Sequence, residues 1–175
     1  MNFGTCIARR ISSSKPFRSW PKGAKNGRLK ALFTDHLEET KDQVLRLKQV
    51  FEILEEKPTG EHCNGMEGVI EEGADALEKD EEGASFDSGI VGAALRTEHY
   101  EIAGYTAAIA MADTLGLKDV SGLLSKNLHE EKLAVDKILA AAKRQSFRNP
   151  RTSQKKKTES LNRRKKIFGP EEPGR

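Results

Sequence analysis

The stretch VGAALRTEHYEIAGYTAAIAMA, residues 91–112, decides the fold class, because its apolar residues recur at three- and four-residue steps. This spacing places seven of them on one face of an α-helix: Val91, Ala94, Leu95, Ile102, Tyr105, Ile109 and Ala112. Glu98 lies in the middle of that face, where the pattern calls for an apolar side chain. A long amphipathic helix with a carboxylate inside its apolar face is therefore predicted.

A second stripe of the same kind runs through LSKNLHEEKLAVDKILAAA, residues 124–142, with Glu131 at its centre. Its apolar members are Leu124, Leu128, Val135, Ile138 and Ala142. Burying an ionised carboxylate is costly unless it is paired, hydrogen-bonded or bound to a metal. Neither stripe contains Lys or Arg, so Glu98 and Glu131 are expected to share a partner. The alternative is that both helices are rotated slightly and the two carboxylates reach water.

Two more helices precede these. A stripe at alternating four- and three-residue steps predicts a helix over residues 29–56, stopped by Pro58 and Gly60. The stripe consists of Phe33, Leu37, Thr40, Val44, Leu47, Phe51 and Leu54. A shorter connecting helix is expected over residues 66–77. The third helix is predicted to be capped by Asp87 or Ser88 and to stop at Gly116. The last helix is predicted to begin at Asp119 or Ser121 and to end near Lys143.

The class is all-α, since no useful length of the chain alternates with the period of a strand. The short loop at Gly116 makes the last two helices antiparallel neighbours. About 30 residues separate the first long helix from the third. We therefore expect an antiparallel helical bundle with one long crossover, which is the ferritin-like arrangement.

Charge divides the chain into three regions. Residues 1–30 hold eight basic residues and no acid, residues 31–139 hold ten basic and 24 acidic, and residues 140–175 hold twelve basic and three acidic. The net charge of the core is thus −14, between basic arms. The expected organisation is a basic, disordered segment over 1–28, a helical domain over 29–143 and a disordered basic tail over 144–175. Such a tail either binds polyanions, nucleic acid included, or only solvates the domain.

The two cysteines, Cys6 and Cys63, form no zinc-ligand or Cys-x-x-Cys spacing, which favours a reducing, cytoplasmic compartment. No apolar run approaches the roughly 20 residues of a membrane helix, so no membrane contact is expected. The Arg- and Ser-rich, acid-free start has the composition of a transit peptide. A truncated, replaced or frame-shifted coding segment gives the same composition.

Several helices could bring Glu and His together on the bundle axis, the recipe for a carboxylate-bridged di-iron or di-manganese site. His36 and Glu39 share one face of the first helix, and Glu101 lies one turn beyond Glu98. The candidate metal ligands are Glu98, Glu131, Glu39, His36 and Glu101, with His99 as a lesser candidate. No catalytic residue is assigned, so whether the protein is an enzyme stays open.

Three short motifs carry a resemblance to a known family: HLEET at 36–40, EHYEIA at 98–103 and EEK at 130–132. Around them, from about Pro21 to Ala142, the chain resembles the YciE/YciF family of stress-associated bacterial proteins, long labelled a domain of unknown function. The resemblance implies a ferritin-like four-helix bundle in the bacterial cytoplasm, usually an oligomer, with a two-metal site and no settled activity.

The chain departs from this family at its start. Members begin with a helix whose glutamate is a metal ligand, and the first 20 residues here contain no acid. A missing helix would leave apolar stripes uncovered, so a dimer or a loose fold is expected. The second metal would bind weakly or not at all. The functional hypotheses are a ferritin-like stress-response protein handling iron or manganese, a non-catalytic scaffold or polyanion-binding protein, and an inactive degenerate copy.

Overall fold

The computed structural model describes residues 27–58, 63–78 and 84–144, all within the unit Met1–Arg144. These residues form four α-helices and no strand, which confirms the all-α class. The helices are α3 (Gly27–Ile53), α4 (Asn64–Glu78), α5 (Ala84–Thr114) and α6 (Lys118–Arg144). None of the described helices is both long enough and apolar enough to cross a membrane. Two predictions concern residues outside these ranges: that the family's first helix is missing, and that the basic arms are disordered.

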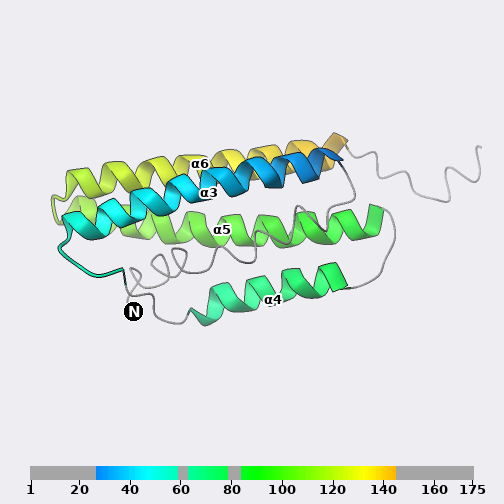
Figure 1. Cartoon of the computed structure of the whole chain (residues 1–175), viewed down its shortest axis with the longest axis horizontal. Coiled ribbons are helices and arrows are strands. Elements are labelled where there is room, and N and C mark those ends of the chain that lie inside the picture. The colour runs from blue at the N-terminus through cyan, green and yellow to red at the C-terminus, as the bar shows by residue number, and fades with distance from the viewer. Residues whose placement is uncertain (1–26, 59–62, 79–83, 145–175) are drawn as a thin grey trace, which may run out of the picture. The chain divides into compact units, whose positions relative to one another are not determined.

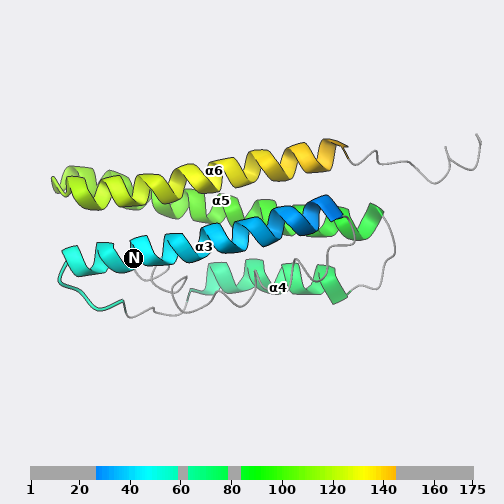
Figure 2. The same ribbon diagram turned by 45° about the horizontal axis from the view of Figure 1, so that its top comes forward.

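The helices alternate in direction, as Figures 1 and 2 show, with α3 and α5 running one way and α4 and α6 the other. Helix α6 packs along both α5 and α3, while α4 packs along α5. The chain leaves the end of α3, passes through α4 and returns to the start of α5. The predicted antiparallel bundle with one long crossover is therefore confirmed.

The turn between α5 and α6 is built as the sequence predicts. Gly116 has a φ of 72°, a left-handed conformation that glycine adopts without steric cost. Its N–H donates to the carbonyl of Asp113 at 3.1 Å, and the N–H of Leu117 donates to that of Ala112 at 2.9 Å. These two bonds form a Schellman motif, which satisfies the last carbonyls of α5.

Helix α3 ends earlier than predicted, through the same motif without a glycine. Glu55 has a φ of 55°, and the N–H of Glu56 donates to the carbonyl of Phe51 at 3.0 Å. The chain has therefore left the helix before it reaches Pro58. Helix α5, in turn, begins at Ala84 rather than after a cap at Asp87 or Ser88.

The face of α3 that enters the core is offset from the predicted stripe. The most buried positions include His36, Gln43 and Val50, whereas Val44 and Phe51 are only partly buried. Both sets have the same spacing, so periodicity alone did not separate them. In the structure, α3 is rotated so that the polar side chains of His36 and Gln43 are buried.

The buried interior has apolar ends and a polar middle. One apolar cluster includes Leu29, Phe33, Ile90 and Ile138, and the other includes Leu47, Val50, Val120 and Leu124. Between them lie eight buried polar side chains: His36, Thr40, Gln43, Thr97, Glu98, Glu101, Asn127 and Glu131. The candidate site is part of this polar layer.

Cys63 precedes α4 and is buried against α5. It is disulfide-bonded, and its Sγ lies 3.2 Å from the hydroxyl of Tyr100. A disulfide departs from the reducing environment that the two cysteines suggested.

Candidate metal centre

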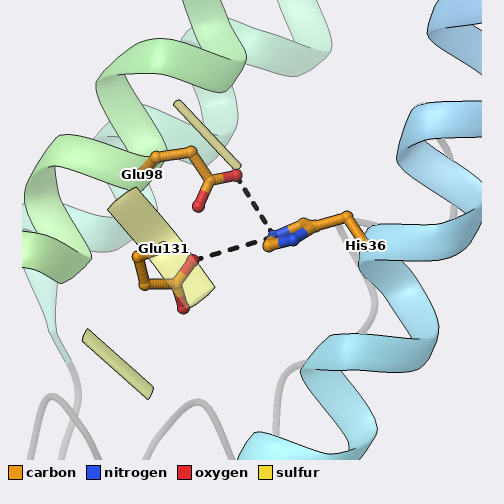
Figure 3. Close-up of side chains that lie close together, drawn as sticks. All are labelled: His36, Glu98 and Glu131. Atoms are coloured by element: carbon orange, nitrogen blue, oxygen red, sulfur yellow. Dashed lines mark ion pairs between the residues drawn. The ribbon is translucent and has the colours of Figure 1, made fainter. Parts of the chain in front are cut away.

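Three helices contribute one side chain each to a cluster in the polar layer. The Nε2 atom of His36, from α3, lies 3.2 Å from Oε1 of Glu98 on α5 and 3.9 Å from Oε2 of Glu131 on α6. Figure 3 shows the imidazole ring directed between the two carboxylates. His36 is therefore the shared partner that the two glutamate-bearing stripes require. We call His36, Glu98 and Glu131 the core triad.

All three side chains of the core triad are withdrawn from water. His36 is 3% exposed, and Glu98 and Glu131 are each 0% exposed. The alternative in which rotated helices carry both glutamates to solvent is therefore wrong. The polar layer excludes water because apolar side chains pack above and below it.

The electrostatics of the core triad favour a charged imidazole. Burial alone would lower the pKa of His36, but its hydrogen bonds to Glu39 and Glu98 and the charges of Glu98 and Glu131 outweigh that effect. The pKa of His36 is raised from 6.5 to about 9. In the absence of a metal, an imidazolium thus lies between the two carboxylates at neutral pH.

Glu39 lies behind the imidazole rather than in front of it. Its Oε2 is 3.3 Å from Nδ1 of His36, and its Oε1 accepts a hydrogen bond from Lys137 of α6 at 2.7 Å. The pKa of Glu39 is lowered to about 2, first by the hydrogen bond to His36 and also by the nearby ammonium of Lys137.

The remaining candidates do not join the core triad. Glu101 is buried one turn farther along α5, outside the group of atoms that converge. His99 is exposed, and its Nδ1 hydrogen-bonds the carbonyl of Leu95 within the same helix. The assignment of each residue as a metal ligand stays a prediction.

The donor set of the core triad suits one divalent cation. One nitrogen and two carboxylate oxygens all lie within 4.8 Å of one another. Around a metal with bonds of about 2.1 Å, neighbouring ligand atoms stand about 3.0–3.4 Å apart. The contact between His36 and Glu98 already has this spacing, and the carboxylate of Glu131 needs to approach by roughly 1 Å, within the reach of a rotamer adjustment.

Two polar contacts near the site are not predicted by the sequence. Lys137 lies off the apolar stripe of α6 and still reaches Glu39 on another helix. Asn127 is fully buried on α6, and its Nδ2 donates to the hydroxyl of Tyr105 at 3.1 Å. A single sequence carries no signal for either contact, because each depends on how α6 is seated against its neighbours.

Comparison with known proteins gives consistent matches. Residues 17–149 match the family described as "Domain of unknown function (DUF892)". The chain is 38% identical over 112 residues to protein YciF of Escherichia coli K12, covering 63% of this chain and 68% of that protein.

Two solved structures resemble the fold. The E. coli stress protein YciF matches with a TM-score of 0.75 at 31% identity, over 80% of this chain and 89% of that one. A protein described as "YcfI, a putative structural protein from Rhodopseudomonas palustris" matches with a TM-score of 0.71 at 37% identity, over 77% and 84% of the two chains.

Proposed function

The chain belongs to the DUF892 family, and from that premise we propose that it is a ferritin-like stress-response protein that holds one divalent iron or manganese ion at the core triad. The observation that carries the proposal is the convergence of His36, Glu98 and Glu131 from three helices in a site closed to water. The family relation supports the stress response, since a relative of similar fold is named a stress protein.

Charge balance supports a divalent cation. Glu98 and Glu131 bring two carboxylates into a layer that excludes water, where a neighbouring positive charge is favourable. A divalent cation bound to Glu98, Glu131 and a neutral His36 would balance the charges of these two carboxylates. Buried charge is unfavourable unless it is balanced, so a set of ligands that is neutral together with the ion favours binding of that ion.

The ligand types support iron or manganese among the divalent metals. Carboxylate oxygens are hard donors that suit Mn²⁺ and Fe²⁺, while one imidazole adds affinity for first-row transition metals. The site has no thiolate among its described residues, which disfavours a zinc site of the structural kind. A bound iron or manganese ion would supply redox chemistry, for example toward peroxide.

A single ion fits better than a pair. A di-metal carboxylate site needs about four carboxylates and two imidazoles. Among the residues that the structure describes, Glu39 is held by His36 and Lys137, and Glu101 lies outside the converging group. We accordingly propose a stoichiometry of one metal per chain.

Metal content after anaerobic loading with Fe²⁺ or Mn²⁺ tests the proposal. The full chain should hold one ion, and a Glu98→Gln, Glu131→Gln double variant should hold none. The matched control is Glu52→Gln with Glu71→Gln, which removes two exposed carboxylates and should retain the ion. Equal metal content in all three proteins would overturn the proposal.

The second candidate function is a non-catalytic scaffold. It is favoured by the raised pKa of His36, because an imidazolium between two carboxylates holds three helices together without any metal. The relative described as a putative structural protein is consistent with such a role. Absence of metal in the loaded full chain, together with strong destabilisation by His36→Gln, would select this reading.

Partners and compartment are also proposals. We propose a homodimer or higher homo-oligomer with weak polyanion contact through the basic arms, whereas the disulfide of Cys63 argues against the cytoplasm as its compartment. The arms themselves lie outside the described residues. Light scattering at several concentrations tests the oligomer, and a salt series with a polyanion, repeated without residues 145–175, tests the arms.

A further inference from the structure

A chain of polar contacts connects the core triad to the surface of α6. Lys137, on α6, is 47% exposed and donates to Oε1 of Glu39 at 2.7 Å. Glu39, on α3, is 32% exposed and places Oε2 3.3 Å from Nδ1 of His36. The other ring nitrogen, Nε2, faces Glu98 and Glu131. The path therefore spans two helices and ends at the nitrogen that would bind the metal.

We propose that Glu39 is a positioning residue for His36 and that Lys137 holds Glu39 in place. The inference rests on the proposed metal site. An imidazole can bind a metal through Nε2 only when Nε2 carries no proton, and a carboxylate that accepts a hydrogen bond from Nδ1–H favours that arrangement. It also fixes the plane of the ring, so that Nε2 points between the two glutamates.

The same contacts argue against Glu39 as a ligand. Both of its oxygens are engaged, one by Lys137 and the other by Nδ1 of His36. It stands on the far side of the imidazole from Glu98, and it is partly exposed whereas the core triad is buried. A ligand role would require Glu39 to break both contacts.

The neighbouring pair Glu38 and Lys41 provides a matched control. Glu38 and Glu39 are adjacent in sequence, and each accepts a hydrogen bond from a lysine at 2.7 Å. The Glu38–Lys41 pair is exposed, within α3, and makes no contact with His36 in the described structure. Replacing either glutamate by Met changes the net charge equally, so a difference between the two variants reports the contact with His36.

Titration of the full chain with Mn²⁺ is the first experiment. Glu39→Met should weaken binding by about 10- to 100-fold with the stoichiometry unchanged, as expected when a carboxylate behind a ligating histidine is lost. Glu39→Gln, whose amide oxygen can still accept a hydrogen bond from Nδ1–H, should recover part of that loss. Glu38→Met should bind as the unaltered chain does. Equal affinity in Glu39→Met and Glu38→Met would overturn the proposal.

A double-mutant cycle tests Lys137. Removing the ammonium of Lys137 raises the affinity for a nearby cation through simple electrostatics, independently of any role of Glu39. If Lys137 acts through Glu39, Lys137→Met must affect Mn²⁺ affinity less favourably in the unaltered chain than in the Glu39→Met background. An identical effect in both backgrounds would overturn the role of Lys137. A manganese-bound crystal structure with Glu39 among the metal ligands would overturn the positioning role of Glu39.

The metal-free protein separates this inference from the proposed function. The Nδ1 proton of His36, held by Glu39, should give a downfield proton resonance that exchanges slowly with water, present in Glu38→Met and absent in Glu39→Met. If the full chain binds no Mn²⁺, the proposed function fails, while this resonance still decides whether Glu39 orients the ring. A resonance unchanged in Glu39→Met would overturn the orientation itself.

Discussion

His36 is the residue whose protonation links the core to pH. Its neighbours among the described residues include Glu98 and Glu131 at Nε2 and Glu39 at Nδ1, with Lys137 behind Glu39. Because the pKa of His36 is about 9 in the fold and 6.5 in the unfolded chain, folding takes up a proton between these values. The resulting stability is fully present below pH 6.5 and is lost as pH rises through 9.

Metal-free protein should therefore lose free energy of unfolding, on the order of 3 kcal/mol, between pH 6.5 and 9. Urea unfolding with EDTA at several pH values measures this dependence. His36→Gln should remove most of the slope, because no imidazole remains to titrate. A slope that survives in His36→Gln would assign the effect to other groups.

Gln43 is a buried polar residue whose side-chain amide lacks hydrogen bonds in the described part of the chain. Its side chain is fully buried, and neither Oε1 nor Nε2 has a hydrogen-bond partner in the described part of the chain. Leaving a buried amide unpaired costs about 1–3 kcal/mol. Gln43→Leu, which has similar volume and no polar atoms, should raise the free energy of unfolding by about 1 kcal/mol.

The control for this substitution is Gln49→Leu, at an exposed position of the same helix, where little change is expected. Urea unfolding of both variants measures the difference. A loss of stability in Gln43→Leu would mean that the amide is satisfied by a bound water and that its removal breaks real hydrogen bonds.

Among the elements, α4 approaches α5 closely where Gly65 meets Tyr100. A Cβ atom at Gly65 would lie 2.6 Å from the hydroxyl oxygen of Tyr100, a distance that requires something to move. Gly65→Ala should therefore destabilise the packing of α4 by about 1–3 kcal/mol. Gly68→Ala, on the same helix with nothing within 4 Å, should stabilise the protein by about 0.5–1 kcal/mol.

Thermal unfolding of the two glycine variants, each compared with the unaltered chain, separates close packing from helix propensity. The two shifts in Tm should have opposite signs. Two upward shifts would show that Tyr100 moves aside easily and that α4 is not held by this contact.

The end of α3 offers a second element-scale prediction. Glu55 adopts a left-handed conformation, which costs a non-glycine residue roughly 1 kcal/mol relative to glycine. Glu55→Gly should raise the free energy of unfolding by about that amount. Glu56→Gly, at a position without positive φ, should not, and chemical denaturation of the two variants checks the contrast. Equal effects would indicate a simple response to lost negative charge.

The sequence predicts which segments are helical better than it predicts which face of each helix is turned toward the core. Four helices, the stop at Gly116 and the burial of Glu98 and Glu131 follow from spacing and turn chemistry. The face of α3 does not, because two overlapping sets of positions have the same period, and only packing against α5 and α6 chooses between them. The early end of α3 escapes prediction too, since Glu55 adopts a conformation typical of glycine. Within the site, the sequence points to Glu98, Glu131 and His36, but the spacing does not tell that His36 faces the two carboxylates while Glu39 lies behind the imidazole.

At the scale of the whole molecule, the core triad joins α3, α5 and α6, whereas α4 contributes no residue to it and packs mainly along α5. A metal that binds the folded state alone stabilises it by about 2.7 kcal/mol at 100 times its Kd. The metal should stabilise α3, α5 and α6 more than α4. Local unfolding of any of the three ligand-bearing helices releases the metal, whereas local unfolding of α4 leaves the ligands in place.

Hydrogen exchange with and without Mn²⁺ measures the distribution. Amides around residues 36, 98 and 131 should become more protected together when Mn²⁺ is added, and amides of α4 should change much less. The Glu98→Gln, Glu131→Gln variant should show no response, which separates binding at the core triad from weak binding to surface acids. Protection confined to one helix would mean that the metal does not bridge the three. Equal protection of α4 would mean that the four helices open as one unit.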